Sequence, residues 1–430
     1  MNHNKQVEKA SLMRNKPYLY LISSQVVSSL GDWLDMLAIM ALVALKWEAS
    51  PIAMAGVGLC LLGPMAVVSP VAGILADKYD RKKLMILSDV IRCLVVIGFV
   101  FSTALWQIYT LLIIKSIFAA LFIPAKNGKL KEIVPESQMQ SAMAISGVVD
   151  NGSKIVGPLI SGLLVSLVGI QWSFYLDAAS FVLSAILLFG VPKTINETFV
   201  NDSGIPKEKE TMISQLKDGL TVLRQIPFLS AGLMVFSVAL LVIQIADTQL
   251  MVLLRQIDGD PTEIVGYGIA ANGIGMLIMS IILSKKKIQS TAIYIGLGSA
   301  VVGLCFAGMV LLVPLSIVMT TILTPLLFFI AGLAAAAIII PFQITAQKGT
   351  PVQYTGRVFG TISSVTTLAS LIGMVSGGVI AEIFGVNMAF VLSGGLLVIV
   401  GIVVLIKRSK LESRVNLAES DRGLQGKASG

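Results

Sequence analysis

Two carboxylates lie three positions apart in the sequence GDWLD, at Asp32 and Asp35, within a run of apolar residues long enough to cross a bilayer. Residues three apart on a helix share roughly one face. Ionisable groups inside a membrane span are costly, so each is a functional candidate. Two neighbouring carboxylates in a poorly solvated cavity suit a proton carrier. The alternatives are that Asp32 pairs with a lysine or arginine inside the membrane, and that Asp35 faces the outer mouth.

Other ionisable and amide side chains fall inside other apolar runs, among them Lys115, which can neutralise an aspartate. Asp150 and Lys154 are four apart and can alternatively satisfy one another. Asp89 and Arg92, three apart, are expected to form a local structural pair. We therefore predict a proton or substrate cavity from the following residues: Asp32, Asp35, Lys115, Asp150, Asn151, Lys154, Asp247 and Asn272.

The single histidine, His3, lies in the polar N-terminal tail, so a histidine relay is excluded and any coupled proton must be carried by carboxylates. No G-x-x-x-x-G-K-[ST] phosphate loop is present, which argues against ATP as the direct energy source. Cys60, Cys93 and Cys305 lack metal-ligand spacing and are expected to be free thiols. We expect no metal and no cofactor, and the polar residues do not form the catalytic set of a membrane-embedded enzyme.

The elements that would hold these side chains are long apolar helices. The chain has 430 residues, of which 55% are hydrophobic and 13% charged, whereas soluble domains are roughly 25% charged. A helix of about 20 apolar residues crosses the hydrocarbon core of a bilayer. Twelve such spans are predicted, at approximately residues 17–45, 51–76, 84–103, 107–125, 139–167, 173–191, 228–254, 262–283, 290–313, 315–342, 357–384 and 387–407. The predicted fold class is all-α and integral to the membrane.

The net charge of +8 follows from the predicted topology. With a cytoplasmic N-terminus, the inner loops and tails hold nearly every lysine and arginine, and the outer loops hold only Lys46 and Arg255. This distribution obeys the positive-inside rule, so the tails at 1–16 and 408–430 are both predicted to be cytoplasmic. The N-terminal segment carries no signal-peptide pattern. The basic charge therefore indicates membrane topology and not a nucleic-acid partner.

An internal repeat relates the two halves of the chain. Six matched pairs lie 216 positions apart: Pro135/Pro351, Gly157/Gly373, Gly162/Gly378, Gly169/Gly385, Phe174/Phe390 and Leu176/Leu392. A six-helix unit duplicated in parallel orientation explains this spacing, with halves at 17–192 and 228–407. The cytoplasmic linker between them, 193–227, has apolar residues at helical spacing and could lie flat on the membrane surface. Two parallel halves are typical of secondary transporters.

The stretch GILADKYDRKKLM, from Gly73 to Met85, places six charges in seven residues between the second and third spans. Its basic residues serve as a positive-inside anchor, but Asp77 contributes nothing to that rule. At the cytoplasmic end of a span, Asp77 can face a helix N-terminus or basic residues, where a carboxylate is favoured. Such a contact would hold the cytoplasmic side closed.

This stretch resembles the G-x-L-A-D-R-x-G-R-K motif that joins helices 2 and 3 in the major facilitator superfamily. Lys78 stands in place of the usual arginine and Asp80 in place of the usual glycine. The second departure, together with SSLGDW near Asp32 and SDVIR near Arg92, is similar to the macrolide-efflux and siderophore-exporter branch. The resemblance covers the whole chain. It implies twelve transmembrane helices arranged as two parallel six-helix halves.

The resemblance also implies roles for particular residues. The cytoplasmic gate would be formed by Gly73, Asp77 and Arg81, the last of which can equally be an anchor. Gly157, Pro158 and Gly162 are similar to the G-P-x-x-G-G stretch of antiporter helix 5, with Ser161 at its first glycine; ordinary close packing is the alternative. Superfamily architecture places helices 1, 4, 7 and 10 along the cavity. By that implication Asp32, Lys115 and Asp247 are the strongest candidates, and Asp177 on helix 6 is structural.

Together these features predict a secondary transporter that exports cationic or amphipathic small molecules by alternating access, driven by protons. The stretch FIPAKNGKLKEIV, Phe122 to Val134, is similar to one in bacterial lysophospholipid transporters, so a lipid flippase or a small-solute importer is the alternative. A channel would not need a two-half repeat with a charged latch. The expected partners are a small-molecule or lipid-like substrate, the proton and the bilayer of the plasma membrane. We expect a monomer.

Overall fold

A computed structural model of the chain describes residues 12–193, 227–256, 261–285, 290–350 and 355–408. The predicted linker with its amphipathic helix and most of both predicted tails lie outside these ranges. The described part is helical and contains no strand. Twelve of its helices are 20 residues or longer, and they follow the order of the twelve predicted spans.

Six long helices precede the linker and six follow it. The first six are α2 (Lys16–Ala41), α3 (Pro51–Lys78), α4 (Arg81–Val100), α5 (Leu105–Ile133), α6 (Glu136–Val168) and α7 (Ile170–Phe189). The second six are α9 (Pro227–Asp247), α11 (Pro261–Lys285), α12 (Thr291–Leu312), α13 (Ile317–Gly349), α14 (Thr355–Phe384) and α15 (Val386–Ile406). The short elements are η1 (Leu12–Arg14), η2 (Leu42–Lys46) and α10 (Leu250–Leu254).

By length and composition, ten helices of the described part could cross a membrane. The two long helices outside this set are α4 and α6. Five of the 20 residues of α4 are charged, at both its start and its middle, and α6 carries Glu136, Asp150 and Lys154. Both helices are predicted spans, at 84–103 and 139–167. The charges of α4 keep it outside the set of ten, whereas α6 includes residues whose side chains the structure does not describe.

The chain divides into two compact units. Unit 1 comprises Met1–Ala49 and Gly56–Pro206, and unit 2 comprises Ser50–Ala55 and Lys207–Gly430. One boundary between the two units thus falls between α7 and α9, and the short segment Ser50–Ala55 at the start of α3 groups with unit 2.

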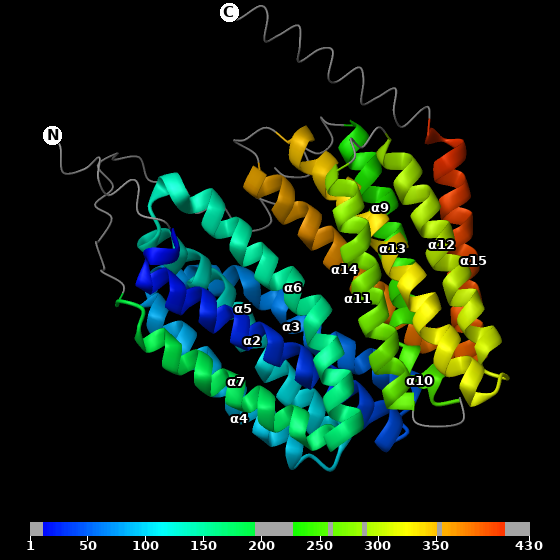
Figure 1. The fold of residues 1–430 in the computed structure, drawn as a ribbon, viewed down its shortest axis with the longest axis horizontal. Helices are drawn as coiled ribbons and strands as arrows, with labels where there is room; N and C mark the ends of the chain where they lie inside the picture. Colours follow the sequence, from blue (N-terminus) through cyan, green and yellow to red (C-terminus); the bar gives the residue numbers. More distant parts are fainter. Residues whose placement is uncertain (1–11, 194–226, 257–260, 286–289, 351–354, 409–430) are drawn as a thin grey trace, which may run out of the picture. The chain divides into compact units, whose positions relative to one another are not determined.

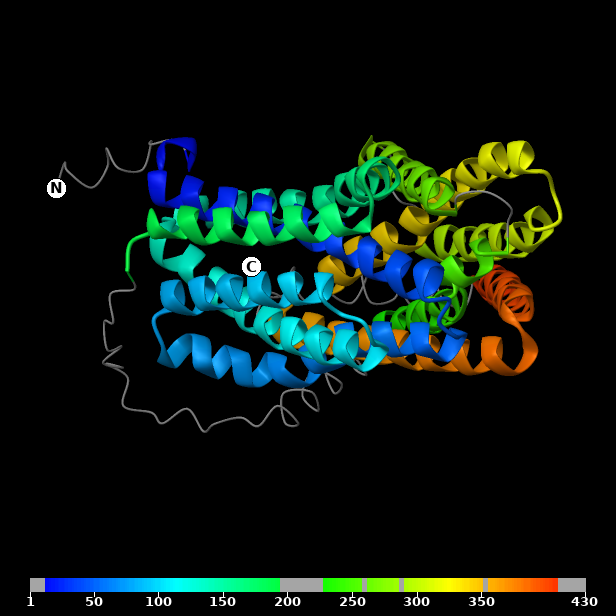
Figure 2. The same cartoon turned by 90° about the horizontal axis from the view of Figure 1, so that it is seen from below.

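In unit 1, α2 packs against α6 and α7, and α4 packs against α5 and α7. The helices of this unit run alongside one another over most of their length (Figures 1 and 2). Glycine sets how closely α2 and α7 approach, because a Cβ at Gly31 would collide with Ser180 and Asp177. This close approach brings the Asp177 side chain toward the residues that follow Gly31 on α2.

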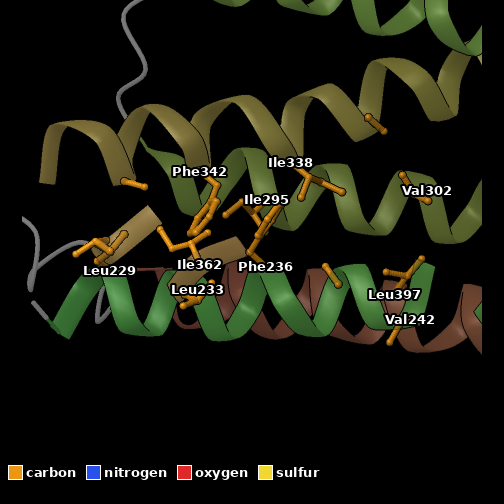
Figure 3. Close-up of a cluster of buried hydrophobic side chains, with 14 residues drawn as sticks. Leu229, Leu233, Phe236, Val242, Ile295, Val302, Ile338, Phe342, Ile362 and Leu397 are labelled. Carbon is orange, nitrogen blue, oxygen red and sulfur yellow. The ribbon is translucent and has the colours of Figure 1, made fainter. Parts of the chain in front are cut away.

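Unit 2 is held together by a continuous apolar core (Figure 3). Leu229, Leu233 and Phe236 of α9 pack against side chains of α12, α13, α14 and α15. The rings of Phe236 and Phe342 stack with their centroids 4.3 Å apart. A Cβ at Gly373 of α14 would collide with the Leu241 carbonyl of α9, so a glycine lets these two helices pack closely.

Two glycines that are 216 positions apart adopt the same unusual backbone conformation. Gly169 has φ 94° and ψ 162°, and Gly385 has φ 87° and ψ 153°. Each immediately precedes a helix, α7 or α15. L-residues with a Cβ rarely adopt this region. Phe174 and Phe390, another pair of the repeat, are 1% and 0% exposed. The repeated sequence positions therefore have repeated structural roles.

Replacing Gly169 or Gly385 with alanine is expected to destabilise the protein by about 1–3 kcal/mol, because the required φ is strained for alanine. The strain is purely conformational, since a Cβ at either position would meet no atom within 4 Å. The matched control is Gly395→Ala in α15, which also meets no atom within 4 Å but is helical. Thermal unfolding in detergent should lower the midpoint for the first two variants and leave it unchanged or raised for the control. Equal midpoints for all three would contradict the assigned backbone role.

Candidate functional site

A cluster of six charged side chains lies within unit 1. Four helices supply them: α2, α4, α5 and α7. The cluster, which we call the ion cluster, consists of Asp32, Asp35, Asp89, Arg92, Lys115 and Asp177. Its two cations lie on different helices, so the cluster ties all four helices together.

Lys115 of α5 is shared among three carboxylates. Its Nζ lies 2.9 Å from Asp32 Oδ1, 2.5 Å from Asp35 Oδ2 and 3.7 Å from Asp177 Oδ2. It also lies 5.6 Å from the ring centroid of Phe181, within the range of a cation–π contact. An ammonium group has three donors on a compact charge, so it can redistribute among several acceptors as their charges change.

Arg92 of α4 provides the second cation. It forms an ion pair with Asp32, and its Nη1 lies 3.6 Å from Asp89 Oδ1. The Ser184 hydroxyl donates a hydrogen bond to the other oxygen of Asp89, at 2.6 Å. The Arg92 guanidinium also stacks 4.1 Å from the ring centroid of Phe181. Arg92 therefore contacts two carboxylates and one aromatic ring. Among the described carboxylates of the ion cluster, Asp32 is the one that pairs with both cations.

Access to solvent distinguishes Asp32 from the rest of the cluster. Its side chain is 39% exposed, whereas those of Asp35, Asp89 and Asp177 are at most 1% exposed. Lys115 is also buried. Asp32 is thus the least buried carboxylate of the ion cluster.

The ion cluster contains more acidic than basic side chains. Among the side chains that the structure describes, four carboxylates face two cations. One oxygen each of Asp35, Asp89 and Asp177 is buried without a hydrogen-bond partner in the described part. A buried carboxylate without compensation is strongly disfavoured. Binding of a proton or a cation would relieve this excess of negative charge.

The structure brings together residues that the sequence only partly grouped. Asp32 does pair with intramembrane cations, which was the alternative to a functional role, but it does so within a larger cluster. Asp35 lies inside the cluster and not at an outer mouth. Arg92 and Asp89 form the expected local pair, and Arg92 also reaches Asp32. Asp177, expected to be structural, approaches Lys115. An ionisable residue in each of four spans was the signal that could have found the full set.

A second polar group in unit 1 joins α2, α5 and α6. Gln25 Nε2 donates to Asp150 Oδ1 at 2.7 Å, and the Ser146 hydroxyl donates to Gln25 Oε1 at 2.9 Å. Lys126 Nζ donates to Ser146 Oγ at 3.3 Å and lies 3.8 Å from Asp150 Oδ2. Asp150 thus finds a cation on α5, where the sequence suggested Lys154. The side chains of Lys154 and of Asn151 lie outside the described residues.

The charged stretch between α3 and α4 contacts the end of α5 within unit 1. We call this contact region the joint. Arg81 Nη1 lies 2.7 Å from Glu132 Oε1 near the end of α5, and Lys129 Nζ lies 2.6 Å from the other oxygen. Arg81 packs directly over Gly128, where a Cβ would collide with the guanidinium. A Cβ at Gly73 would meet no atom within 4 Å, so close packing does not explain that glycine. The side chain of Asp77 lies outside the described residues.

Asp80 and Lys82 cap two helices at this joint. The Asp80 carboxylate accepts hydrogen bonds from the backbone N–H groups of Lys82 at 2.9 Å and Lys83 at 3.4 Å, so it is the N-cap of α4. Lys82 Nζ donates to the carbonyls of Phe189 and Val191 at the end of α7, at 2.8 and 2.6 Å. The aspartate that replaces the usual glycine of the motif therefore has a local structural role.

Replacing Asp80 with alanine is expected to cost about 1 kcal/mol of stability, because it removes the cap, while Asp80→Gly should cost only a few tenths. Asp80→Asn keeps a capping side chain and is the matched control. Unfolding in detergent micelles should rank stability as aspartate and asparagine first, glycine close behind and alanine last. If alanine is as stable as aspartate, the cap contributes nothing.

The small residues of α6 pack against α2. A Cβ at Gly157 would collide with Trp33, and the Ser161 hydroxyl donates to the Leu34 carbonyl at 2.9 Å. Both contacts flank the segment that carries Asp32 and Asp35. Pro158 and Gly162 lie among the residues of α6 that are not described. The described part of this motif positions the ion cluster by close packing.

In unit 2, Asp247 and Asn272 line one cavity of about 170 Å³. They come from α9 and α11, and the remaining walls are apolar. The two predicted residues of the second half thus share one cavity within unit 2. The structure describes no group of three or more His, Cys, Asp or Glu side chains that could hold a metal ion.

Comparison with known proteins gives one consistent result. The model of the Major Facilitator Superfamily matches residues 21–374 and 326–427. The chain is 42% identical to the uncharacterized MFS-type transporter YfiS of Bacillus subtilis, over 98% of this chain and 100% of that protein. It is 28% identical to macrolide efflux protein A of Streptococcus pyogenes, over 80% and 84% of the two chains. It is 25% identical to the multidrug resistance protein MdtG of Salmonella typhimurium, over 77% and 79%.

Solved structures share the fold at low sequence identity. A peptide transporter of the POT family superposes with a TM-score of 0.70 at 13% identity, covering 93% of this chain and 96% of that chain. The nucleoside transporter NupG superposes with a TM-score of 0.68 at 18% identity, covering 91% and 99%. These likenesses bear out the predicted architecture of twelve helices in two halves.

Proposed function

This chain belongs to the Major Facilitator Superfamily, and on that premise we propose that it is a proton-coupled exporter of cationic or amphipathic small molecules. Like its family and its relatives, it is a multi-pass membrane transporter and not an enzyme. Export as the direction is supported by the relatives whose names refer to macrolide efflux and multidrug resistance.

The observation that carries the proposal is the excess of carboxylates in the ion cluster. A proton on Asp32 would weaken its contacts with Arg92 and Lys115 and leave Lys115 to Asp35 and Asp177. Loss of that proton would draw both cations back to Asp32. The cluster joins four helices, so each protonation state favours a different balance of contacts among them. Such a two-state element is what alternating access requires.

The joint at Arg81 supports the family role of this region as a gate. Arg81, Lys129 and Glu132 form a compact charge group at one end of unit 1. A gate needs a rigid support for the residue that makes and breaks contact. We propose that this group supplies that support for Asp77.

The alternative of a lipid transporter was based on a stretch of residues that contact other residues of unit 1. Within FIPAKNGKLKEIV, Lys126 faces Ser146 and Asp150, Gly128 receives Arg81, and Glu132 pairs with Arg81 and Lys129. These contacts explain the residue types of the stretch without a lipid headgroup. They favour the exporter over the flippase.

The charge distribution supports the topology that goes with this function. We propose that both termini and the linker lie in the cytoplasm and that the protein resides in the plasma membrane as a monomer. Cysteine introduced into the N-terminal tail should then be labelled by an impermeant reagent in inside-out vesicles and protected in intact cells.

The proposal can be tested in inside-out vesicles with an acidic lumen and a lumenal pH dye. Erythromycin, other cationic drugs and lysophosphatidylcholine would be added in turn. Weak bases enter passively and raise the pH, so the signal is the difference from vesicles without the protein. We expect cationic drugs to increase proton release through the protein. Proton release with lysophosphatidylcholine but with none of the cationic drugs would contradict the exporter and favour the lipid transporter.

A further inference from the structure

The cavity of unit 2 combines one carboxylate with aromatic walls. Its lining includes Asp247, Asn272 and the rings of Phe306, Phe328 and Phe390. The rings of Phe306 and Phe390 meet edge to face, with centroids 5.7 Å apart. Pockets that bind small molecules have this composition, mostly apolar with a few polar groups that fix orientation.

Asp247 lies where a membrane span is interrupted. Helix α9 ends at Asp247 and α10 begins at Leu250, although Leu229–Leu254 is a single apolar stretch of 26 residues. The C-terminal end of a helix carries partial negative charge, which adds to the carboxylate. Interrupted helices of this kind hold cations in other transporter folds. The backbone and the side chain at this position therefore both attract a positive group.

No lysine or arginine of the described ranges forms an ion pair with Asp247. Its side chain is exposed to the cavity space. This contrasts with the ion cluster, where Lys115 and Arg92 already contact the carboxylates. The carboxylate in unit 2 thus has the capacity to take a cation from outside the chain.

Asn272 supplies a second acceptor. Its Nδ2 donates to the Phe328 carbonyl at 3.2 Å. A backbone carbonyl can only accept, so the amide nitrogen must be the atom that points there. Asn272 Oδ1 is then the remaining acceptor on a side chain that lines the cavity. A ligand with an N–H donor would satisfy it, whereas a quaternary ammonium would not.

We propose that this cavity binds the protonated amine head of an apolar cation, with Asp247 as its counter-ion, Asn272 as an acceptor for its N–H and the phenylalanine rings around its carbon atoms. The inference rests on the proposed function, because it assigns a place in unit 2 to the cationic part of the substrate. A cavity of about 150 Å³ accepts benzene, so a volume of about 170 Å³ fits a single six-membered ring. Larger substrates would place only their amine-bearing end here.

Cys305 offers a direct readout, because it also lines this cavity. We would prepare the full-length protein in nanodiscs with Cys60→Ala and Cys93→Ala, leaving Cys305 as the one thiol of the chain. The rate of its alkylation would be measured with N-methylpiperidine, with its uncharged isostere methylcyclohexane and with N,N-dimethylpiperidinium. The first probe has charge, shape and an N–H, the second has the shape alone, and the third lacks the N–H.

N-methylpiperidine is expected to protect Cys305 at the lowest concentration. Replacing Asp247 with the isosteric asparagine should raise the half-protecting concentration about ten- to a hundredfold, as expected for a charge-assisted hydrogen bond. In Asp247→Asn the amine should protect no better than methylcyclohexane. Equal protection by both probes in the parent protein, or an unchanged amine response in Asp247→Asn, would overturn the proposal.

Asp32→Asn separates this inference from the proposed function. It alters the ion cluster of unit 1 and leaves every residue of the cavity unchanged. Amine protection of Cys305 is expected to persist in Asp32→Asn even where proton release is lost. Protection of Cys305 by the amine without substrate-driven proton movement in the parent protein would contradict the proposed coupled exporter and support the amine site. Proton release without protection would do the reverse.

Discussion

Replacing Lys115 with methionine is expected to lower the free energy of unfolding by about 3–5 kcal/mol and to abolish transport. The change removes the cation that contacts Asp32, Asp35 and Asp177 while keeping a similar side-chain length. Breaking a buried ion pair by removing one partner has this cost, because the remaining charge is left uncompensated. Equilibrium unfolding in mixed micelles measures the first effect, and uptake into inside-out vesicles measures the second.

Asp177→Asn is the matched comparison for Lys115→Met. It removes one carboxylate from a cluster that has an excess of them, and asparagine can still accept from the Ser180 hydroxyl, which lies 3.1 Å from Asp177 Oδ1. We expect a much smaller loss of stability, and we expect Asp177→Asn to recover part of the loss when combined with Lys115→Met. If removing the aspartate is as damaging as removing the lysine, the excess of negative charge in the cluster is not real.

Asp32→Asn is expected to abolish proton coupling while leaving the fold intact. The Asp32 side chain is 39% exposed, and each cation keeps another carboxylate when Asp32 is neutralised. Arg92 keeps Asp89, and Lys115 keeps Asp35 and Asp177. In vesicles with a pH gradient, substrate should no longer drive proton release through the variant, although the variant reaches the membrane in normal amounts.

Asp80→Asn serves as the control for Asp32→Asn. It makes the same chemical change in unit 1, at a helix cap outside the ion cluster, and asparagine caps a helix as well as aspartate does. This control should release protons like the parent protein. Normal proton release by Asp32→Asn would remove Asp32 from the coupling and leave the buried carboxylates as its carriers.

The long helices could be predicted from the sequence because each one contains a run of about 20 mostly apolar residues. The predicted third span, 84–103, is α4 at Arg81–Val100, and the difference arises because Asp80 caps the helix three residues earlier. A prediction from hydropathy starts the helix at its first apolar residues, so it misses an N-cap that lies among charged residues. The repeat at 216 positions also predicted equivalent backbone positions, as Gly169 and Gly385 demonstrate.

The candidate site was less accessible to sequence reasoning, because apolar periodicity does not fix which helices meet or how each is rotated. Arg92 is three residues from Asp89 in the chain, and its partnership with Asp32, 60 residues away, depends on how α4 and α2 are placed. Asp177 was assigned a structural role because helix 6 lies outside the cavity in the family. Gly31 lets α7 approach α2 closely enough for Asp177 to reach Lys115.

The same limit applies to Asp150. Its helical neighbour Lys154 was the natural partner by spacing, yet the structure places Asp150 beside Lys126 of α5 and Gln25 of α2. Contacts between helices decide such pairings, and a single sequence does not contain them.

Infrared spectroscopy of the purified protein in nanodiscs tests most directly whether the ion cluster holds an exchangeable proton. Protonated carboxyl groups give a C=O band distinct from that of carboxylates, and each aspartate can be identified by its loss on substitution with asparagine. We predict such a band at neutral pH in the parent protein that disappears on adding substrate and that is absent from Asp32→Asn. A spectrum without a protonated carboxyl at neutral pH, or with one that substrate and Asp32→Asn leave unchanged, would contradict proton coupling through this cluster.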